Sequence, residues 1–260
     1  MIIDGKDRLV YFSELFSGYL QSKVDDYVSP TDTMMNEWYM SVGESGARAV
    51  YAACVASWLG KVTNVLDLPC GHGRVLRHLI KLFPNATFDA ADLDREGVDF
   101  CAKRFGATPI YSEEDLTEVD FGRAYDVIWV GSLFTHVPRV RMRLWLAHLT
   151  KFLNTGGIVV ATFHGRYSAI KGGEFGYIEQ SRWGKILEDY SANGYGYDDY
   201  PPANGHSYMH GTYGISLSKP AAIMADAEAI PDVRVFSYVE RGWAGHQDVL
   251  VLGKPGVVEG

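Results

Sequence analysis

The chain has 260 residues, of which 47% are hydrophobic and 22% are charged, and its formal net charge is −8. This composition is typical of a globular protein and excludes a disordered one, and no apolar run approaches the roughly 18 residues that span a membrane. The acidic balance argues against nucleic acid as a partner, because an electrostatic grip on phosphates needs clustered Lys and Arg. A chain of this length can bury the core of a single α/β domain.

The cysteines and the first residues bear on the cellular compartment. Cys54, Cys70 and Cys101 are too few and too scattered for a disulfide framework. The first residues also lack the basic and then apolar order of a secretory signal. We therefore expect a reduced, cytoplasmic protein, and the sequence leaves a homo-oligomer open.

The first part of the chain predicts helices. Residues 1–45 contain helical fragments that are broken by Ser29-Pro30 and by Gly43, and we expect them to form an N-terminal helical cap. From Gly46 to Leu59, small and apolar residues recur at spacings of three and four, which is the period of a buried helix face. A helix is expected over that range.

After Gly60, short apolar runs alternate with helical stretches, which is typical of a doubly wound parallel sheet in the α/β class. Helices are expected at residues 75–83, Glu96–Arg104 and Arg139–Leu153; Pro84 ends the first, and Asn154–Gly157 closes the last. The expected strands are Asn64–Leu68, Thr87–Ala91, Thr108–Tyr111, Tyr125–Val130, Ile158–Phe163, Arg234–Val239 and Asp248–Leu252.

Residues 165–214 break this regularity. They contain ten glycines and ten aromatic residues, Tyr208 among them, and show little periodicity beyond a helix expected at Ile178–Tyr190. A long irregular insertion in a compact domain is usually a lid or a binding loop. We predict that this insertion, placed before the last two strands, selects the substrate.

The clearest motif runs from Val65 to Arg74, where an apolar strand enters a glycine turn that opens a helix. Glycines allow a ligand to approach the backbone, and the first N–H groups of the helix face that ligand. A nicotinamide dinucleotide site would carry a third glycine at position 76, which is Leu76 here. The Asp67 carboxylate instead favours a cationic ligand, and Asp92, nineteen residues after Gly73, suits ribose hydroxyls.

Together with Gly131-Ser132 at the exit of the Tyr125–Val130 strand and with Gly156-Gly157, these motifs resemble class I S-adenosylmethionine-dependent methyltransferases. The resemblance covers roughly residues 40–165. It implies a seven-stranded sheet whose last strand is antiparallel, and it implies S-adenosylmethionine as the cofactor. The single domain would then comprise the cap (1–45), the cofactor-binding core (46–164), the insertion (165–214) and the C-terminal strands (215–260).

The resemblance also assigns the cofactor-binding residues. By likeness, Asp67, Gly71 and Gly73 line the amino-acid end of the cofactor, Asp92 and Leu93 the ribose, and Ser112 and Glu113 the adenine. Pro69 stands where the family usually has glycine or a small residue. Pro69, Cys70 and Arg74 belong to the same loop, and Gly131 and Ser132 to the exit of the strand.

Trp38 and Tyr39 precede the first core helix and could place an aromatic face near the sulfonium, although core packing is the simpler interpretation.

Methyl transfer to a hydroxyl needs a group that takes up the proton, and histidine suits neutral pH. His136 leaves the fourth strand and is the first candidate, followed by His164 and His246. Each imidazole could instead cap a helix or pack in a loop. No His and Asp cluster has the spacing of metal ligands, so metal-independent chemistry is expected.

The acceptor is the least determined part. Ser132–His136 and Gly242–Asp248 are similar to stretches of bacterial methyltransferases encoded near glycan-building enzymes. The leading hypothesis is O-methylation of a sugar or glycan hydroxyl. The alternatives are a small non-sugar metabolite as acceptor, and a non-catalytic scaffold that binds the cofactor.

Overall fold

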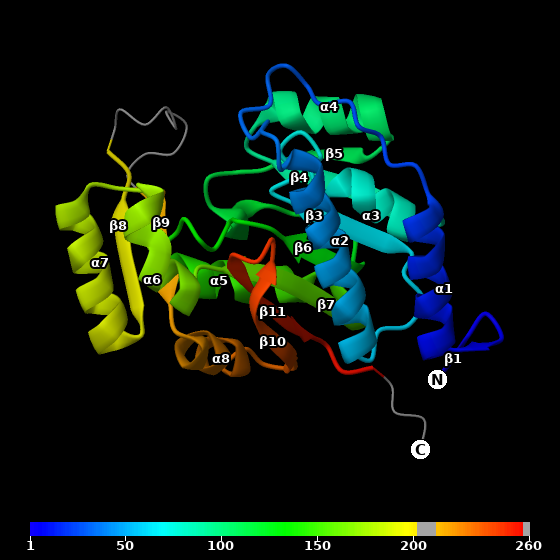
Figure 1. The fold of residues 1–260 in the computed structure, drawn as a ribbon. Coiled ribbons are helices and arrows are strands. Elements are labelled where there is room, and N and C mark those ends of the chain that lie inside the picture. The colour runs from blue at the N-terminus through cyan, green and yellow to red at the C-terminus, as the bar shows by residue number, and fades with distance from the viewer. Residues whose placement is uncertain (202–211, 257–260) are drawn as a thin grey trace.

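The computed structural model describes residues 1–201 and 212–256, so Tyr208 lies outside the described residues. Its centre is a seven-stranded sheet in the order β10-β11-β7-β6-β3-β4-β5 (Figure 1). Strands β7, β6, β3, β4 and β5 are parallel, whereas β11 runs antiparallel to both β7 and β10. The α/β class and the mostly parallel seven-stranded sheet are confirmed. The strands are β3 (Asn64–Leu68), β4 (Thr87–Asp92), β5 (Thr108–Tyr111), β6 (Tyr125–Val130), β7 (Leu153–Phe163), β10 (Arg234–Trp243) and β11 (Gln247–Gly253).

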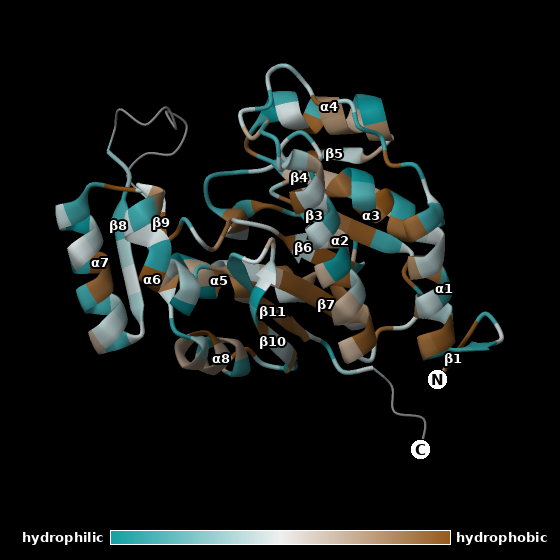
Figure 2. Ribbon diagram, in the orientation of Figure 1, coloured by the Kyte–Doolittle hydropathy of each residue, from teal (hydrophilic) through white to brown (hydrophobic). Residues whose placement is uncertain are grey.

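Helices cover both faces of the sheet because successive strand residues point to opposite sides. Val65 packs into the first core, beneath α1 (Arg8–Gln21), α2 (Tyr39–Ala56), α3 (Leu76–Leu82) and α4 (Arg95–Phe105). Leu66 packs into the second, beneath α5 (Arg139–Lys151) and α8 (Pro220–Glu228). In Figure 2 the central strands are mostly brown, which marks the apolar interior between these layers.

The local chemistry explains where the helices begin and end. The Asp94 side chain accepts the N–H of Glu96 at the start of α4, and Gly106, with φ of 71°, ends it. Two expected limits were wrong. α2 begins at Tyr39, seven residues before Gly46, and ends at Ala56. α5 ends at Lys151, because β7 already begins at Leu153.

The insertion is more regular than its sequence predicts. It contains α6 (Arg166–Phe175), α7 (Gln180–Asn193), β8 (Tyr195–Asp199) and β9 (Gly214–Ser218), and α7 confirms the one helix expected there. β8 and β9 form an antiparallel pair, and Trp183, Ile186, Ile215 and Leu217 form a small core of their own. In Figure 1 this unit stands at one side of the main sheet, beyond α5.

The remaining elements are short. β1 (Ile2–Ile3) pairs with β2 (Lys6–Asp7) before α1, and a 3-10 helix, η1 (Leu116–Glu118), follows β5. Among the helices of the described ranges, none is long and apolar enough to cross a bilayer.

Candidate cofactor and acceptor site

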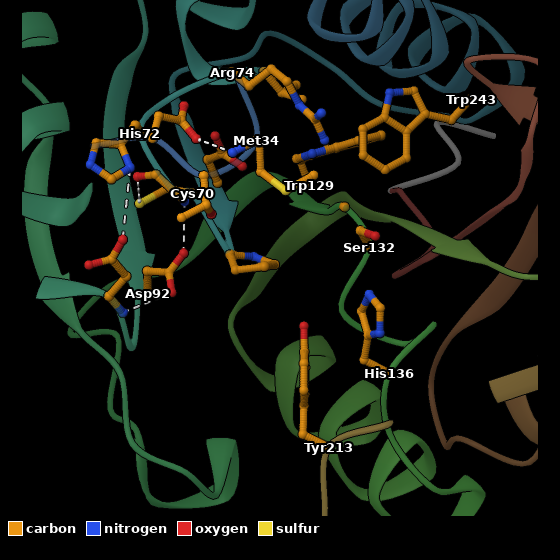
Figure 3. Close-up of a pocket in the computed structure, with 18 residues that line it drawn as sticks. Met34, Cys70, His72, Arg74, Asp92, Trp129, Ser132, His136, Tyr213 and Trp243 are labelled. Carbon is orange, nitrogen blue, oxygen red and sulfur yellow. Dashed lines mark hydrogen bonds and ion pairs between the residues drawn. The ribbon is translucent and has the colours of Figure 1, made fainter. Parts of the chain in front are cut away.

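A cavity of about 230 Å³ opens at the carboxyl ends of β3, β4 and β6, the edge at which open α/β sheets bind ligands (Figure 3). Six segments form its walls. They are the N-terminal segment before α2, the end of β3 with its glycine loop, the exit of β4, the exit of β6, the residue before β9, and the β10–β11 hairpin. The lining residues are Asp32, Thr33, Met34, Asp67, Pro69, Cys70, Gly71, His72, Arg74, Val75, Asp92, Asp94, Trp129, Gly131, Ser132, His136, Tyr213 and Trp243.

The glycine loop is held in place by Asp92. The N–H of Gly71, whose φ is 47°, donates to Asp92 Oδ2 at 2.7 Å, and the N–H of Asp94 donates to Oδ1 at 3.0 Å. Burial raises the pKa of Asp92. Gly73 serves packing instead of lining the cavity, because a Cβ there would lie 2.6 Å from the Phe105 ring.

Asp67 is the most unusual group in the cavity wall. Its side chain is 1% exposed, and its Oδ2 has no hydrogen-bond partner in the described part of the chain. Burial, and then the nearby Asp92 carboxylate, hold the pKa of Asp67 well above its usual range. Burying a carboxylate is costly when one of its oxygens accepts no hydrogen bond, and a cation bound in the cavity would relieve that cost. The site therefore fits a ligand with ammonium and sulfonium groups.

A second, smaller cavity of about 80 Å³ adjoins the first and shares Asp92, Pro69, Ser132 and Tyr213 with it. Leu93, Ser112 and Glu113 line it, together with Leu68, Leu116, Leu133 and Trp145. The residues expected at the ribose and adenine are thus placed side by side, in an enclosure with an apolar floor that suits a flat heterocycle.

Trp38 and Tyr39 do not line either cavity. The Trp38 side chain is 63% exposed, and Tyr39 is 2% exposed because its ring packs inward at the start of α2. The Tyr39 hydroxyl donates to Asp32 Oδ2 at 2.7 Å. Met34, with Asp32 and Thr33, forms the wall that the sequence assigned to the two aromatic residues.

The exit of β6 is fixed by a closed set of hydrogen bonds. The Ser132 N–H donates to Thr162 Oγ1 at 2.8 Å, Thr162 donates to Gln247 Oε1 at 2.6 Å, and Gln247 Nε2 donates to Ser132 Oγ at 3.0 Å. This set holds Ser132 at a φ of 60°, a conformation that is unfavourable for a residue with a Cβ. Gly131 lies beside it because a Cβ there would meet the Trp129 ring at 2.6 Å.

Of the three candidate histidines, only His136 lines the cavity. Its Nδ1 lies 2.8 Å from the carbonyl oxygen of Gly214, and its ring stacks on Tyr213 with a centroid distance of 4.8 Å. In Figure 3 the imidazole points from the exit of β6 toward Ser132. His136 and Tyr213 therefore form the end of the cavity nearest the insertion.

His164 and His246 lie behind this wall. His164 is 3% exposed and stacks on both Tyr177 and His246 at 5.3 Å. Burial, and then the other two histidines, hold its pKa well below the usual range. His246 Nε2 pairs with the Tyr177 hydroxyl at 2.9 Å, and burial lowers the pKa of His246 as well. Both imidazoles favour the neutral state, and both pack against Tyr177 of the insertion.

The sequence missed several cavity residues. Trp129 and Trp243 pack edge to face with a centroid distance of 5.2 Å. Trp129 sits in an apolar strand that looks like ordinary core, and Trp243 lies beyond the strand expected at Arg234–Val239, in a stretch for which the sequence predicted no place at the cavity. His72 lies between the two glycines of the loop and could have been found from that position. Tyr213 and Met34 carry no motif. No group of three or more His, Cys, Asp or Glu side chains suited to a metal ion occurs within residues 1–201 and 212–256.

Comparison with known proteins agrees with this geometry. Residues 66–159 match a family model described as a methyltransferase domain. This match agrees with the class I S-adenosylmethionine-dependent methyltransferase family that the sequence resembles. The match and the cavity around Asp67 and Asp92 agree with S-adenosylmethionine, the cofactor that the sequence predicts.

Curated relatives of the methyltransferase domain match it over part of their length. A malonyl-[acyl-carrier protein] O-methyltransferase 1 from Ilyobacter polytropus is 30% identical over 106 residues, which are 40% of this chain and 39% of that protein. A malonyl-[acyl-carrier protein] O-methyltransferase from Halalkalibacterium halodurans is 29% identical over 93 residues, which are 32% and 34% of the two chains. The chain thus spans little more than a third of the length of these relatives.

Solved structures extend the likeness to nearly the whole fold. An S-adenosylmethionine-dependent methyltransferase from Clostridium acetobutylicum has a TM-score of 0.56 and 13% identity, over 96% of this chain and 100% of that one. The methyltransferase CcbJ from Streptomyces caelestis has a TM-score of 0.54 and 14% identity, over 88% and 100%. At such identities the likeness establishes the fold alone.

Proposed function

We propose that this protein is an S-adenosylmethionine-dependent O-methyltransferase whose acceptor is a neutral hydroxyl, that of a sugar or a glycan. The observation that carries the proposal is the position of His136. It lies in the same cavity as Asp67 and Asp92, at the end opposite the N-terminal wall. A base is thus available where an acceptor would meet the cofactor.

The hydrogen bond of His136 fixes which nitrogen can act as the base. A carbonyl oxygen only accepts, so the contact with Gly214 requires the proton to be on Nδ1. In the neutral ring, Nε2 is then the basic nitrogen. The cofactor supplies a methyl group on a sulfonium. On transfer, the methyl carbon would leave sulfur as a neutral thioether and join the acceptor oxygen, and His136 Nε2 would take up the proton that this oxygen loses.

The cofactor contacts follow from the same cavity. Asp92 would accept hydrogen bonds from the ribose hydroxyls, and Asp67 would face the cationic end of the cofactor. Leu93, Ser112 and Glu113 would enclose the adenine. Together with Gly71, these residues leave the His136 end of the cavity for the acceptor.

The charges in the cavity favour a hydroxyl over a carboxylate acceptor. The named relatives methylate a malonyl group, and a carboxylate acceptor carries no proton and gains from a nearby cation. Among the described lining residues, four are aspartates and one is an arginine, Arg74. The Arg74 guanidinium lies over the rings of Trp243 and Tyr39, on the side away from His136. A neutral acceptor suits this field better than an anion does.

The preference for a sugar rests on aromatic surfaces at the acceptor end. Tyr213 and Tyr200 lie next to His136, and their ring centroids are 5.8 Å apart. Such faces suit the apolar side of a sugar ring. A small non-sugar metabolite remains the second candidate, because the same faces suit other planar or apolar acceptors.

The test offers cofactor with a labelled methyl group together with nucleotide sugars, oligosaccharides, small phenols and a malonyl acyl-carrier protein. We expect label in a sugar hydroxyl, and we expect His136→Gln to lower kcat about 100- to 10,000-fold with little change in cofactor Kd. His148→Gln is the control, because His148 bonds the Val119 carbonyl at 2.9 Å and lines neither cavity.

The other outcomes separate the alternatives. Label that enters only phenols or only the malonyl group overturns the sugar acceptor. Unchanged turnover in His136→Gln would contradict the role of His136 as the base. Absence of binding of both the cofactor and its demethylated product overturns the enzyme proposal as a whole.

A further inference from the structure

Arg77, on α3, is a buried cation that does not line the cofactor cavity. Its side chain is 1% exposed, and no carboxylate pairs with it in the described part of the chain. A buried guanidinium is costly unless every donor finds a partner. Here the partners are neutral oxygens, and the faces of Tyr39 and Phe105 lie 5.1 and 5.2 Å from the guanidinium carbon.

The donors of Arg77 reach two segments that are separate in the sequence. Nε donates to the carbonyl of Gly73 at 3.0 Å, and Nη2 to that of His72 at 3.2 Å, both in the glycine loop. Nη1 donates to the carbonyls of Asp25 and Tyr27 at 3.1 and 2.8 Å, both in the segment between α1 and α2. Figure 1 shows this segment crossing beside α4 before it returns to α2.

A further bond carries the connection to the cavity itself. Nη2 of Arg77 donates to the Tyr39 hydroxyl at 3.2 Å, and that hydroxyl donates to Asp32 Oδ2 at 2.7 Å. Asp32 Oδ1 in turn accepts the N–H of Met34 at 2.9 Å. Asp32 and Met34 both line the cavity, so one continuous set of hydrogen bonds joins the glycine loop to the opposite wall.

The outer part of the segment has its own anchor. Arg104 on α4 pairs with Asp25 at 2.7 Å, and Tyr27 stacks on Phe100 with a centroid distance of 6.2 Å. These contacts hold residues 25–27 against α4 and do not reach the cavity. Nearer the cavity, Thr31 Oγ1 lies 3.3 Å from His72 Nε2, while Asp32 itself is held by the shorter bond from Tyr39 that Arg77 supports.

We propose that Arg77 is a positioning residue for cofactor binding, acting through Tyr39 and Asp32 to hold residues 32–34 against the ligand. The inference rests on the assignment of the cavity to the cofactor and not on the identity of the acceptor. Loss of the connection lets one wall move, so the cofactor binds more weakly. Turnover at saturating cofactor falls much less, since His136 lies at the other end of the cavity.

The test compares two substitutions that each remove one buried tyrosine hydroxyl. Tyr39→Phe breaks the connection. Tyr19→Phe is the matched control, because Tyr19 is 4% exposed, its hydroxyl bonds His78 Nδ1 at 2.9 Å, and neither residue lines the cavity. His78 follows Arg77 directly on α3. Both variants lose a buried hydrogen bond, but only one loses it within the proposed network.

We expect Tyr39→Phe to raise the cofactor Kd and KM about tenfold and Tyr19→Phe to change them less than twofold. Arg77→Lys keeps the charge but cannot reproduce the planar set of donors, and we expect at least the same increase. Calorimetry with the cofactor and the unfolding midpoint of each variant are the measurements. Equal changes in Kd for the two tyrosine variants, or an unchanged Kd in Tyr39→Phe, would overturn the inference. Lack of binding by the unsubstituted protein would instead contradict the cofactor assignment.

Discussion

The cofactor side and the acceptor side of the cavity are built in different ways. On the cofactor side, Asp67, Gly71 and Asp92 come from two neighbouring strands and the loop between them, and one hydrogen bond joins the loop to the second strand. On the acceptor side, the backbone N–H groups of Gly214, Ser216 and Ser218 in β9 donate to His136, Thr135 and His164. The first arrangement is local in the sequence, whereas the second joins residues about 50 to 80 positions apart.

This difference separates the parts of the molecule that can change independently. The glycine loop and the end of β4 are held together by hydrogen bonds that do not involve the insertion. The insertion has its own core around Trp183 and Ile215 and touches the cavity through Tyr213 and His136. We therefore expect substitutions on one side to leave the function of the other side largely intact.

The largest effect on cofactor binding is expected at Asp92. Asp92→Ala removes the carboxylate that holds Gly71 and that would accept from the ribose, and it should weaken cofactor binding about 100-fold or more. Calorimetric titration with the cofactor measures this loss. Asp99→Ala on the neighbouring α4 is the control, since Asp99 pairs with the Tyr111 hydroxyl and lines neither cavity. A Kd for Asp92→Ala within a few-fold of the control would contradict the assignment.

An intermediate effect is expected inside the insertion. A Cβ at Gly172 would lie 2.2 Å from the Trp183 ring, whereas one at Gly184 meets nothing within 4 Å. Gly172→Ala should lower the free energy of unfolding by about 1–3 kcal/mol, and Gly184→Ala should leave it unchanged or raise it by up to about 1 kcal/mol.

Denaturant unfolding measures the stability of the two glycine variants, and calorimetric titration measures their cofactor Kd. Together they test whether a change in the insertion affects the cofactor side of the cavity. We expect an unchanged cofactor Kd in both. A loss of cofactor affinity in Gly172→Ala that matches its loss of stability would show that the two sides are one cooperative unit.

The smallest effect is expected at Gln247. Gln247→Leu keeps the volume but frees Ser132 Oγ and Thr162 Oγ1, and we expect turnover to fall about tenfold with cofactor Kd within twofold. Steady-state kinetics with a saturating cofactor measures it. Asn154→Leu is the control, because Asn154 bonds Asp126 at 2.7 Å and lines neither cavity. Equal turnover in the two variants would contradict the role of Gln247 in positioning Ser132 on the acceptor side.

The sequence predicted the sheet, its order of elements and the residues of the glycine loop, because these depend on short-range periodicity and on glycine at defined turns. Leu93, Ser112 and Glu113, which the resemblance assigns to the ribose and the adenine, line one cavity with Asp92. It did not predict β8 and β9, since Gly214–Ser218 becomes a strand only by pairing with Tyr195–Asp199, across a long gap.

Tyr39 shows a second limit of the sequence. An aromatic residue before a core helix gives no signal of the direction in which its ring points. The structure turns the ring inward, where Arg77 and Asp32 use its hydroxyl, and leaves the cavity wall to Met34. Contacts between residues 32, 39 and 77 depend on how the N-terminal segment folds back, which no local pattern encodes.

The turn between β10 and β11 touches both sides of the cavity at once. Trp243 Nε1 donates to the Val42 carbonyl, and the Ala244 N–H donates to Ser45 Oγ; both acceptors are on α2. Gln247, four residues after Trp243, orients Ser132. Four residues of chain therefore link α2 to the exit of β6, and this link does not include the insertion. A change in the shape of the insertion would leave the distance between these two walls the same.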